Sequence, residues 1–113
     1  MEPIHYYSTN RNLDGVPGIT PFKGHVSFRD ALLQGQAPDE GLYMPDRIPR
    51  ISPEDIASLK GRPYAEAAML VAGAFLSEEM DSATLRNIVE DSYPFTVPLE
   101  HVVGRKYVMR LDQ

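Results

Sequence analysis

The sequence predicts a small α+β domain with about four helices and a small, mainly antiparallel sheet. Four segments begin with helix-capping residues and continue with apolar residues at helical spacing. Between and after them, short runs rich in aromatic or β-branched residues are bounded by glycine and proline, which is typical of strands. The length of 113 residues suits one domain over 1–113, which can bury roughly two-thirds of the surface that its unfolded chain exposes.

The chain opens with a predicted strand and a long loop. Residues 4–8 alternate weakly and include two tyrosines, which favours a strand. Residues 9–24 hold three glycines and two prolines, a composition that opposes both helix and strand. We therefore expect a surface loop over about residues 9–24.

The first helix is predicted to follow Ser27. Its hydroxyl can accept a hydrogen bond from a first-turn amide, which makes this residue a suitable N-cap. Phe28, Ala31 and Leu32 then share one face at helical spacing. Gly35 is expected to end the helix in a left-handed conformation.

A turn and a short strand are predicted next. Residues 38–41, Pro-Asp-Glu-Gly, are typical of a turn, and residues 42–44 are typical of a strand closed by Pro45. The side chain of Asp39 is expected to bond the backbone of its own turn. Glu40 is compatible with this turn only if its φ is negative, because residues with side chains rarely adopt positive values.

Two further helices have clear start signals. Ser52 is a suitable N-cap, and Pro53 stands at the first helical position, where its missing amide has no cost. Pro63 opens a longer helix that runs through Leu76, in which Glu66 is the only charged residue. A helix that is apolar on every side needs cover on nearly every side. We expect it to be the central element, or to present part of its surface to a further domain.

The fourth helix is predicted to begin at Asp81 or Ser82 and to be amphipathic. Its apolar face is expected to pack on the third helix. The predicted core joins three residues of the third helix to three of the fourth: Leu70, Val71 and Phe75 against Leu85, Ile88 and Val89.

The carboxyl-terminal segments 96–99 and 106–111 have strand character, separated by a Gly104-Arg105 turn signal. Alternate positions in 107–111 are apolar, so this segment is expected to form an edge strand or to be partly disordered. An edge strand offers unpaired amides and carbonyls to a second copy. We therefore expect the isolated chain to self-associate as its concentration rises.

The composition excludes several classes of partner. A net charge of −5 gives no positive field to attract nucleic acid. The longest apolar run, residues 67–76, is about half the length of a membrane span, and the amino terminus lacks a secretion signal, so we expect no membrane partner. The absence of cysteine removes disulfides and thiolate chemistry, and it fits a reducing cytoplasm.

No catalytic, cofactor-binding or metal-binding residue is predicted within the chain. Three histidines lie far apart without metal-site spacing, and surface or packing roles are expected for them: His5, His25 and His101. No serine lies in a nucleophile-elbow pattern. Three lysines are isolated in polar segments and are expected to be solvated: Lys23, Lys60 and Lys106. Three carboxylates precede the fourth helix, where its dipole favours them without any catalytic role: Glu78, Glu79 and Asp81.

Several stretches resemble the start of the threonine synthase family, whose members use pyridoxal phosphate (PLP) to convert O-phosphohomoserine and water to threonine and phosphate. The resemblance rests above all on residues 27–45, Ser-Phe-Arg-Asp-Ala-Leu-Leu-Gln-Gly-Gln-Ala-Pro-Asp-Glu-Gly-Leu-Tyr-Met-Pro. Residues 6–10, Tyr64-Ala65-Glu66 and the pair Tyr93 and Phe95 follow in the family's order. The bacterial and fungal type is the subgroup that the chain resembles most.

The resemblance implies that the chain is the amino-terminal domain of such an enzyme, present as a fragment, with the catalytic PLP domain expected after residue 113. That domain would be its partner, PLP the cofactor and O-phosphohomoserine the substrate of the full enzyme. The fragment itself is expected to bind no PLP and to be inactive. The resemblance makes Asp39, Glu40 and Gly41 candidates for the wall of the substrate cleft, although the family commonly has a second glycine where Glu40 stands.

A stand-alone, non-catalytic interaction module derived from the same domain is the alternative interpretation. The family continues after a strand resembling residues 107–113 into a Gly-Pro-Ser/Thr segment and then Phe-Lys-Asp, whose lysine carries the cofactor. A reading frame that continues in this way would favour the enzyme over the module.

Overall fold

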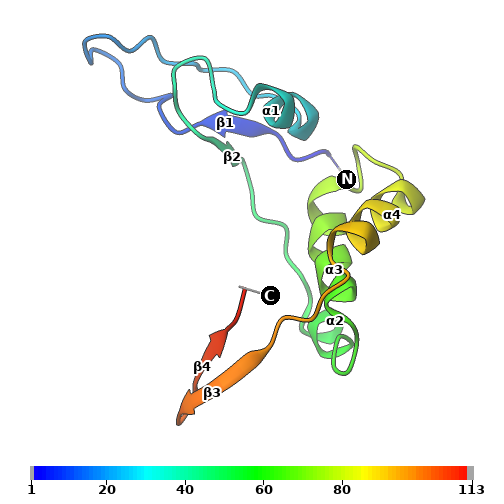
Figure 1. The fold of residues 1–113 in the computed structure, drawn as a ribbon. Coiled ribbons are helices and arrows are strands. Elements are labelled where there is room, and N and C mark those ends of the chain that lie inside the picture. Colours follow the sequence, from blue (N-terminus) through cyan, green and yellow to red (C-terminus); the bar gives the residue numbers. More distant parts are fainter. Residues whose placement is uncertain (1, 112–113) are drawn as a thin grey trace. The chain divides into compact units, whose positions relative to one another are not determined.

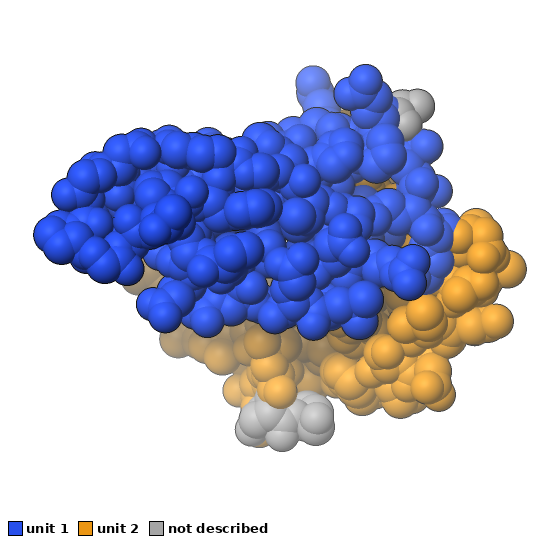
Figure 2. All heavy atoms as spheres, turned by 90° about the horizontal axis from the view of Figure 1, so that it is seen from above, with its two compact units in different colours: residues 1–50, 75–80 blue, residues 51–74, 81–113 orange. Residues whose placement is uncertain are grey.

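The structure, a computed structural model, describes residues 2–111 and confirms a small α+β fold (Figure 1). Its elements follow one another as β1 (Tyr6–Ser8), α1 (Phe28–Gln34), β2 (Tyr43–Pro45), α2 (Pro53–Ala57), α3 (Tyr64–Leu76), α4 (Ser82–Ser92), β3 (Leu99–Val103) and β4 (Lys106–Met109). In the described range the strands form two separate antiparallel ladders, β1–β2 and β3–β4. The chain divides into two compact units, coloured in Figure 2: unit 1 is residues 1–50 and 75–80, and unit 2 is residues 51–74 and 81–113.

In unit 1, β1 is the centre of a small sheet. It pairs with β2 so that Tyr7 lies opposite Met44. On its other edge Tyr6 and Val26 exchange two backbone hydrogen bonds of 2.8 and 2.9 Å. The first strand therefore begins at Tyr6, two residues later than the predicted range 4–8. Strand β2 lies one residue later than the predicted range 42–44.

The core of unit 1 is a small apolar cluster under this sheet. Ile4, Tyr6 and Ala31 are buried, and four partly buried side chains pack against them: Val26, Phe28, Tyr43 and Phe75. Phe75, which the sequence analysis expects against the fourth helix, packs against this cluster in unit 1.

The helix caps confirm the predictions made from single residues. Gly35 ends α1 with φ 75°, and its amide donates to the carbonyl of Ala31. Each N-cap side chain accepts a hydrogen bond from the amide three residues later: Ser27 from Asp30, Ser52 from Asp55 and Asp81 from Thr84. These signals succeed because both partners lie within one turn of the chain.

In unit 2, α3 and α4 bury less than predicted. Leu85 and Val89 of α4 are buried, but Ile88 is 48% exposed and Val71 of α3 is 47% exposed. No described residue of α3 is fully buried. The predicted burial of Val71 and Ile88 is wrong, because this small unit does not hold enough chain to cover an all-apolar helix on every side. Three rings near the ends of α3 and α4 pack with centroids 5.6 to 6.2 Å apart: Tyr64, Tyr93 and Phe95.

Strands β3 and β4 form a hairpin around a tight turn. Gly104 has φ 55° in this turn, as its sequence signal predicts. The strand predicted over 96–99 begins only at Leu99 and continues to Val103. The turn sets the register of a hairpin, so the residues beside the turn pair with each other. At the other end of the ladder, Pro98 has no amide that could donate a further hydrogen bond. As predicted, β4 is an edge strand, since it pairs with β3 alone in the described chain.

Candidate functional site

The predicted turn at 38–41 meets the loop 9–24 at the buried carboxylate of Asp39 in unit 1. Asp39 is 6% exposed, and both of its oxygens accept hydrogen bonds. Oδ1 accepts from Ser8 Oγ at 2.5 Å and from the Gly41 amide at 3.0 Å, and Oδ2 accepts from the Phe22 amide at 2.7 Å. The bond from Gly41 confirms the predicted contact of Asp39 with its own turn. The other two bonds tie the turn to the end of β1 and to the far end of the loop.

Ser8 and Asn10 complete this polar cluster. Ser8 is fully buried, and its hydroxyl donates to Asp39 while accepting from the Asn10 amide at 3.1 Å. The Asn10 side chain donates to the carbonyl oxygen of Asp39 at 3.0 Å. We call Ser8, Asn10, Phe22, Asp39 and Gly41 the Asp39 latch. It closes the base of the loop, because the loop begins and ends at its members.

The hydrogen bonds keep Asp39 ionised despite its burial. Burial by itself raises the pKa of a carboxyl group. Here the hydrogen bonds from Ser8, Phe22 and Gly41 outweigh burial, and the pKa of Asp39 is lowered. Its charge is therefore fixed at neutral pH, and both oxygens are engaged by the protein itself.

Gly41 lies at a position that has no room for a larger side chain. It is buried, and a Cβ built on it would lie 2.2 Å from Ser8 Oγ and 2.9 Å from the Asn10 amide nitrogen. Any larger residue would push the latch apart. The sequence pattern predicts a turn glycine here. It does not predict the close approach to Ser8 and Asn10, because these residues lie more than 30 positions away.

Glu40 adopts the left-handed conformation, with φ 66°, so the prediction of a negative φ is wrong. Two hydrogen bonds hold it there: its amide donates to Ala37 at 2.9 Å, and its carbonyl oxygen accepts from the Gln36 side chain at 2.9 Å. This conformation costs about 1–2 kcal/mol for a residue with a Cβ. A glycine, which the resembling family commonly has here, would avoid that cost.

A polar hollow of about 180 Å³ lies beside the turn, in unit 1. Its lining comes from the loop and from the turn: Gly18, Ile19, Thr20, Pro38, Asp39 and Glu40. Of the three predicted cleft candidates, Asp39 has both oxygens occupied and Gly41 is enclosed. Glu40 is exposed, and its carboxylate is the group that could accept a hydrogen bond from a ligand or hold a cationic group.

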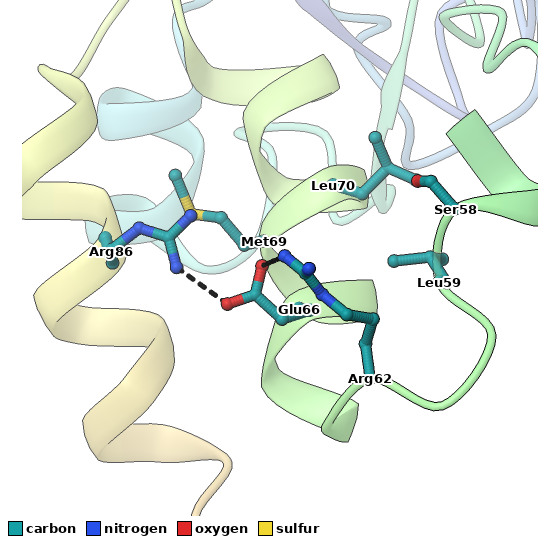
Figure 3. Close-up of a pocket in the computed structure, with 7 residues that line it drawn as sticks. All are labelled: Ser58, Leu59, Arg62, Glu66, Met69, Leu70 and Arg86. Carbon is teal, nitrogen blue, oxygen red and sulfur yellow. Dashed lines mark hydrogen bonds and ion pairs between the residues drawn. The ribbon is translucent and has the colours of Figure 1, made fainter. Parts of the chain in front are cut away.

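A second hollow, of about 260 Å³ in unit 2, is built around Glu66 (Figure 3). Figure 3 shows the Glu66 carboxylate between two guanidinium groups. Its oxygens lie 3.0 Å from Arg86 and 3.7 Å from Arg62. Arg86 also pairs with Glu90 at 3.3 Å, and its hydrogen bonds with Glu66 and Glu90 raise its pKa. The two positive charges are balanced by two carboxylates, so this cluster joins α3 to α4 and offers no excess charge to an anion. The sequence showed Glu66 as an isolated charge, although Arg62 stands at the i,i+4 spacing that predicts one of these pairs.

The remaining predicted roles are ordinary ones. Among residues 2–111 no group of three or more metal-binding side chains comes together. His25 and His101 contact tyrosine rings, and the three lysines are exposed, as predicted. No helix in the described range is long and apolar enough to cross a membrane.

Comparison with known proteins gives one consistent result. Residues 5–93 match a family model described as threonine synthase N terminus. Over 91 residues the chain is 36% identical to threonine synthase of Pseudomonas aeruginosa, which covers 76% of this chain and 19% of that protein. Over 86 residues it is 34% identical to threonine synthase of Haemophilus influenzae, covering 76% and 20%.

A crystal structure of PLP-bound threonine synthase from Brucella melitensis has the same fold, with a TM-score of 0.75 and 29% identity. The match covers 96% of this chain and 22% of that one. The chain thus spans about a fifth of the length of the relatives it matches.

Proposed function

Because this chain belongs to the threonine synthase N-terminus family, we propose that it works as the amino-terminal part of a threonine synthase. Such an enzyme converts O-phosphohomoserine and water to threonine and phosphate with the help of PLP. The observation that carries the proposal is the family match over residues 5–93. The similarity in fold to the Brucella melitensis enzyme supports it.

The residues of this chain do not fit a PLP site. PLP enzymes hold the cofactor through a lysine and a partner for the ring nitrogen, and its phosphate needs a cradle of donors. In the described chain the three lysines are exposed, and Lys23 pairs with Asp14 at 2.7 Å. We therefore assign no chemical step to this chain, and we place the cofactor in the remaining four-fifths of the proposed enzyme.

The contribution of the chain would be to support that body and to wall part of the substrate cleft. The Asp39 latch fixes both ends of the loop 9–24 and the turn that carries Glu40. Glu40 would present its carboxylate to the cleft. A carboxylate repels a phosphate group, so this wall would shield the substrate and contact its ammonium group rather than bind its phosphate.

The first experiment tests whether the isolated chain lacks catalysis. We expect the 113-residue chain, mixed with PLP, to show no visible absorbance from lysine-bound cofactor and no change on borohydride treatment. It should release no phosphate from O-phosphohomoserine. Covalent binding of PLP would mean that one of the exposed lysines carries the cofactor, and would overturn the assignment of chemistry to the remaining body.

A chimera tests the positive part of the proposal. The chain would replace the matching amino-terminal fifth of Pseudomonas aeruginosa threonine synthase, and phosphate release would be measured. We expect turnover in the chimera, and a loss of turnover when it carries Gly41→Ala, which breaks the latch. Glu40→Gln keeps the turn and removes the charge, so it should change KM for substrate without unfolding the protein. A chimera that folds and binds PLP without turnover would contradict the proposed role.

A stand-alone interaction module is the second candidate, and the β3–β4 hairpin favours it. All nine residues of its two strands are exposed, which leaves a surface free for a partner. An inactive chimera together with a stably folded isolated chain would support this alternative.

A further inference from the structure

The outer face of the unit 1 sheet carries an arginine that lies on a tyrosine ring. Tyr6 and Ser8 of β1 are buried, so Tyr7 between them points to the opposite face of the ladder. The guanidinium carbon of Arg11 lies 3.5 Å from the centre of the Tyr7 ring, which is a cation–π contact. The two side chains therefore form one unit on this face.

Hydrogen bonds of the backbone fix Arg11 over this ring. The Arg11 amide donates to the carbonyl oxygen of Ser8 at 3.2 Å, which turns the chain back after β1. Asn10, the residue before it, makes two hydrogen bonds within the Asp39 latch, of 3.1 and 3.0 Å. The Arg11 side chain thus starts from a fixed point, and the flat Tyr7 ring sets the plane of its guanidinium group.

Arg11 differs from the other partly buried arginines of the described chain, Arg86 and Arg110, because it has no acidic partner. Arg86 pairs with Glu66 at 3.0 Å. Arg110 pairs with Glu100, also at 3.0 Å. In the described part of the chain no carboxylate lies within ion-pair distance of Arg11. A charge that loses part of its hydration needs an opposite charge or hydrogen-bond acceptors in exchange.

The stacked position leaves the binding edge of the guanidinium group free. The Tyr7 ring covers one flat side of the group, whereas its N–H donors lie in the plane and point outward. Such a fork can bind two oxygens of one phosphate or carboxylate group at once. His25 lies against the same ring, with ring centroids 6.3 Å apart. An imidazole carries at least one N–H donor in either protonation state.

We propose that Arg11 and His25, on either part of the Tyr7 ring, bind the oxyanion of a small phosphate monoester. A carboxylate has two oxygens, which the arginine fork alone satisfies. A phosphate monoester has three terminal oxygens, so it can also accept a hydrogen bond from His25. The contacts that carry this inference lie within unit 1, and it stands independently of the proposed function.

The site is a weak one. A single fork and one further donor correspond to a dissociation constant of about 1 to 10 mM for inorganic phosphate. The net charge of −5 opposes the anion only weakly, because salt at about 0.1 M screens charges over roughly 10 Å.

Titration of the isotope-labelled 113-residue chain with inorganic phosphate, followed by NMR at constant ionic strength, is the test. The signals of Arg11, Tyr7 and His25 should shift along one saturating curve. Acetate should bind at least about fivefold more weakly, because it cannot use the third donor. Shifts that do not saturate at about tenfold the expected dissociation constant would overturn the proposal. Tighter binding of acetate would also overturn it, and would assign the fork to a carboxylate instead.

Arg11→Lys keeps the charge but loses the planar fork, so it should weaken phosphate binding at least about fivefold. Arg29→Lys is the matched control, because Arg29 is an exposed arginine of α1 without an ion pair in the described chain. This control should leave the phosphate affinity unchanged. Equal weakening by both variants would mean that phosphate does not select Arg11, and would contradict the proposal.

His25→Ala separates the two anions without touching the core, since His25 is exposed. This variant should weaken phosphate binding about threefold or more and leave acetate binding unchanged. Tyr7→Phe keeps the ring under the guanidinium group and should bind phosphate as the parent chain does. An unchanged phosphate affinity in His25→Ala would overturn the choice of a phosphate monoester as the ligand.

Discussion

The two antiparallel ladders of this protein, β1–β2 and β3–β4, differ in what surrounds them. In unit 1, β1 has three residues, of which Tyr6 and Ser8 are buried. In unit 2, the longer β3–β4 ladder buries none of its nine residues. The shorter ladder is therefore the one with a core, so burial here follows from what covers the strands and not from the length of the pairing.

The difference lies in two kinds of support. The β1–β2 ladder has an apolar cluster on one side, including Ala31 of α1, and the buried Asp39 latch at its end. The β3–β4 ladder has neither. We expect backbone amides of β1 to exchange with solvent more slowly than those of β3, and the variants below alter this contrast.

Gly41→Ala should have the largest effect on the contrast. Its Cβ would overlap Ser8 and the Asn10 backbone, and such overpacking should lower the free energy of unfolding by about 3 kcal/mol. Denaturant unfolding and hydrogen exchange of β1 would measure it. Gly104→Ala in the β3–β4 hairpin is the control. Apart from its chain neighbours, no atom lies within 4 Å of the added Cβ, so this variant should affect β3–β4 exchange alone. A loss below about 1 kcal/mol for Gly41→Ala would mean that the latch can open without cost.

Phe75→Ala should weaken the cover of β1. Phe75 is partly buried against Ile4, Tyr6 and Ala31, so its removal should cost about 2 kcal/mol, less than the usual cost for a fully buried ring. Val71→Ala, at a position that is half exposed on the same helix, should change stability much less. Equal effects at the two positions would place Phe75 outside the core.

Asp39→Asn should weaken the latch without changing its size. An amide can replace only one carboxylate oxygen as an acceptor, so its NH₂ group would face a donor, either Ser8 or the Phe22 amide. We expect the folding equilibrium to fall roughly tenfold. The exchange rates of β1 amides should rise while those of β3 stay the same.

The pH dependence of stability provides the control for this variant. Because the folded state lowers the pKa of Asp39, the unfolded chain binds this proton more readily. The resulting stability is fully present above the ordinary carboxyl pKa of about 3.9 and is lost as the pH falls through the lower folded-state pKa. Asp39→Asn should flatten this acid dependence. An unchanged acid profile would show that other carboxyl groups cause it.

Glu40→Gly should have the smallest effect, and in the opposite direction. Glycine adopts the φ of 66° without a steric cost, so stability should rise by about 1 kcal/mol. Glu40→Gln keeps the Cβ and should give no gain. A lower free energy of unfolding for Glu40→Gly would mean that the left-handed conformation of Glu40 is not a source of strain.

Local features of this protein were determined by the sequence itself. The caps at Ser27, Ser52 and Asp81, and the glycine that ends α1, are readable because donor and acceptor lie within four residues of each other. The family resemblance was also readable, since it depends on the order of residues along the chain and was shown by the match over residues 5–93.

Tertiary structure decided the features that depend on distant partners. Asp39 lies 31 residues from Ser8 and 17 from Phe22, so no local pattern shows that its turn is also a latch. The place of Phe75 beside β1 follows the same rule. Hydrogen bonds within one turn depend on neighbouring residues alone, whereas burial depends on which segments meet once the chain has folded.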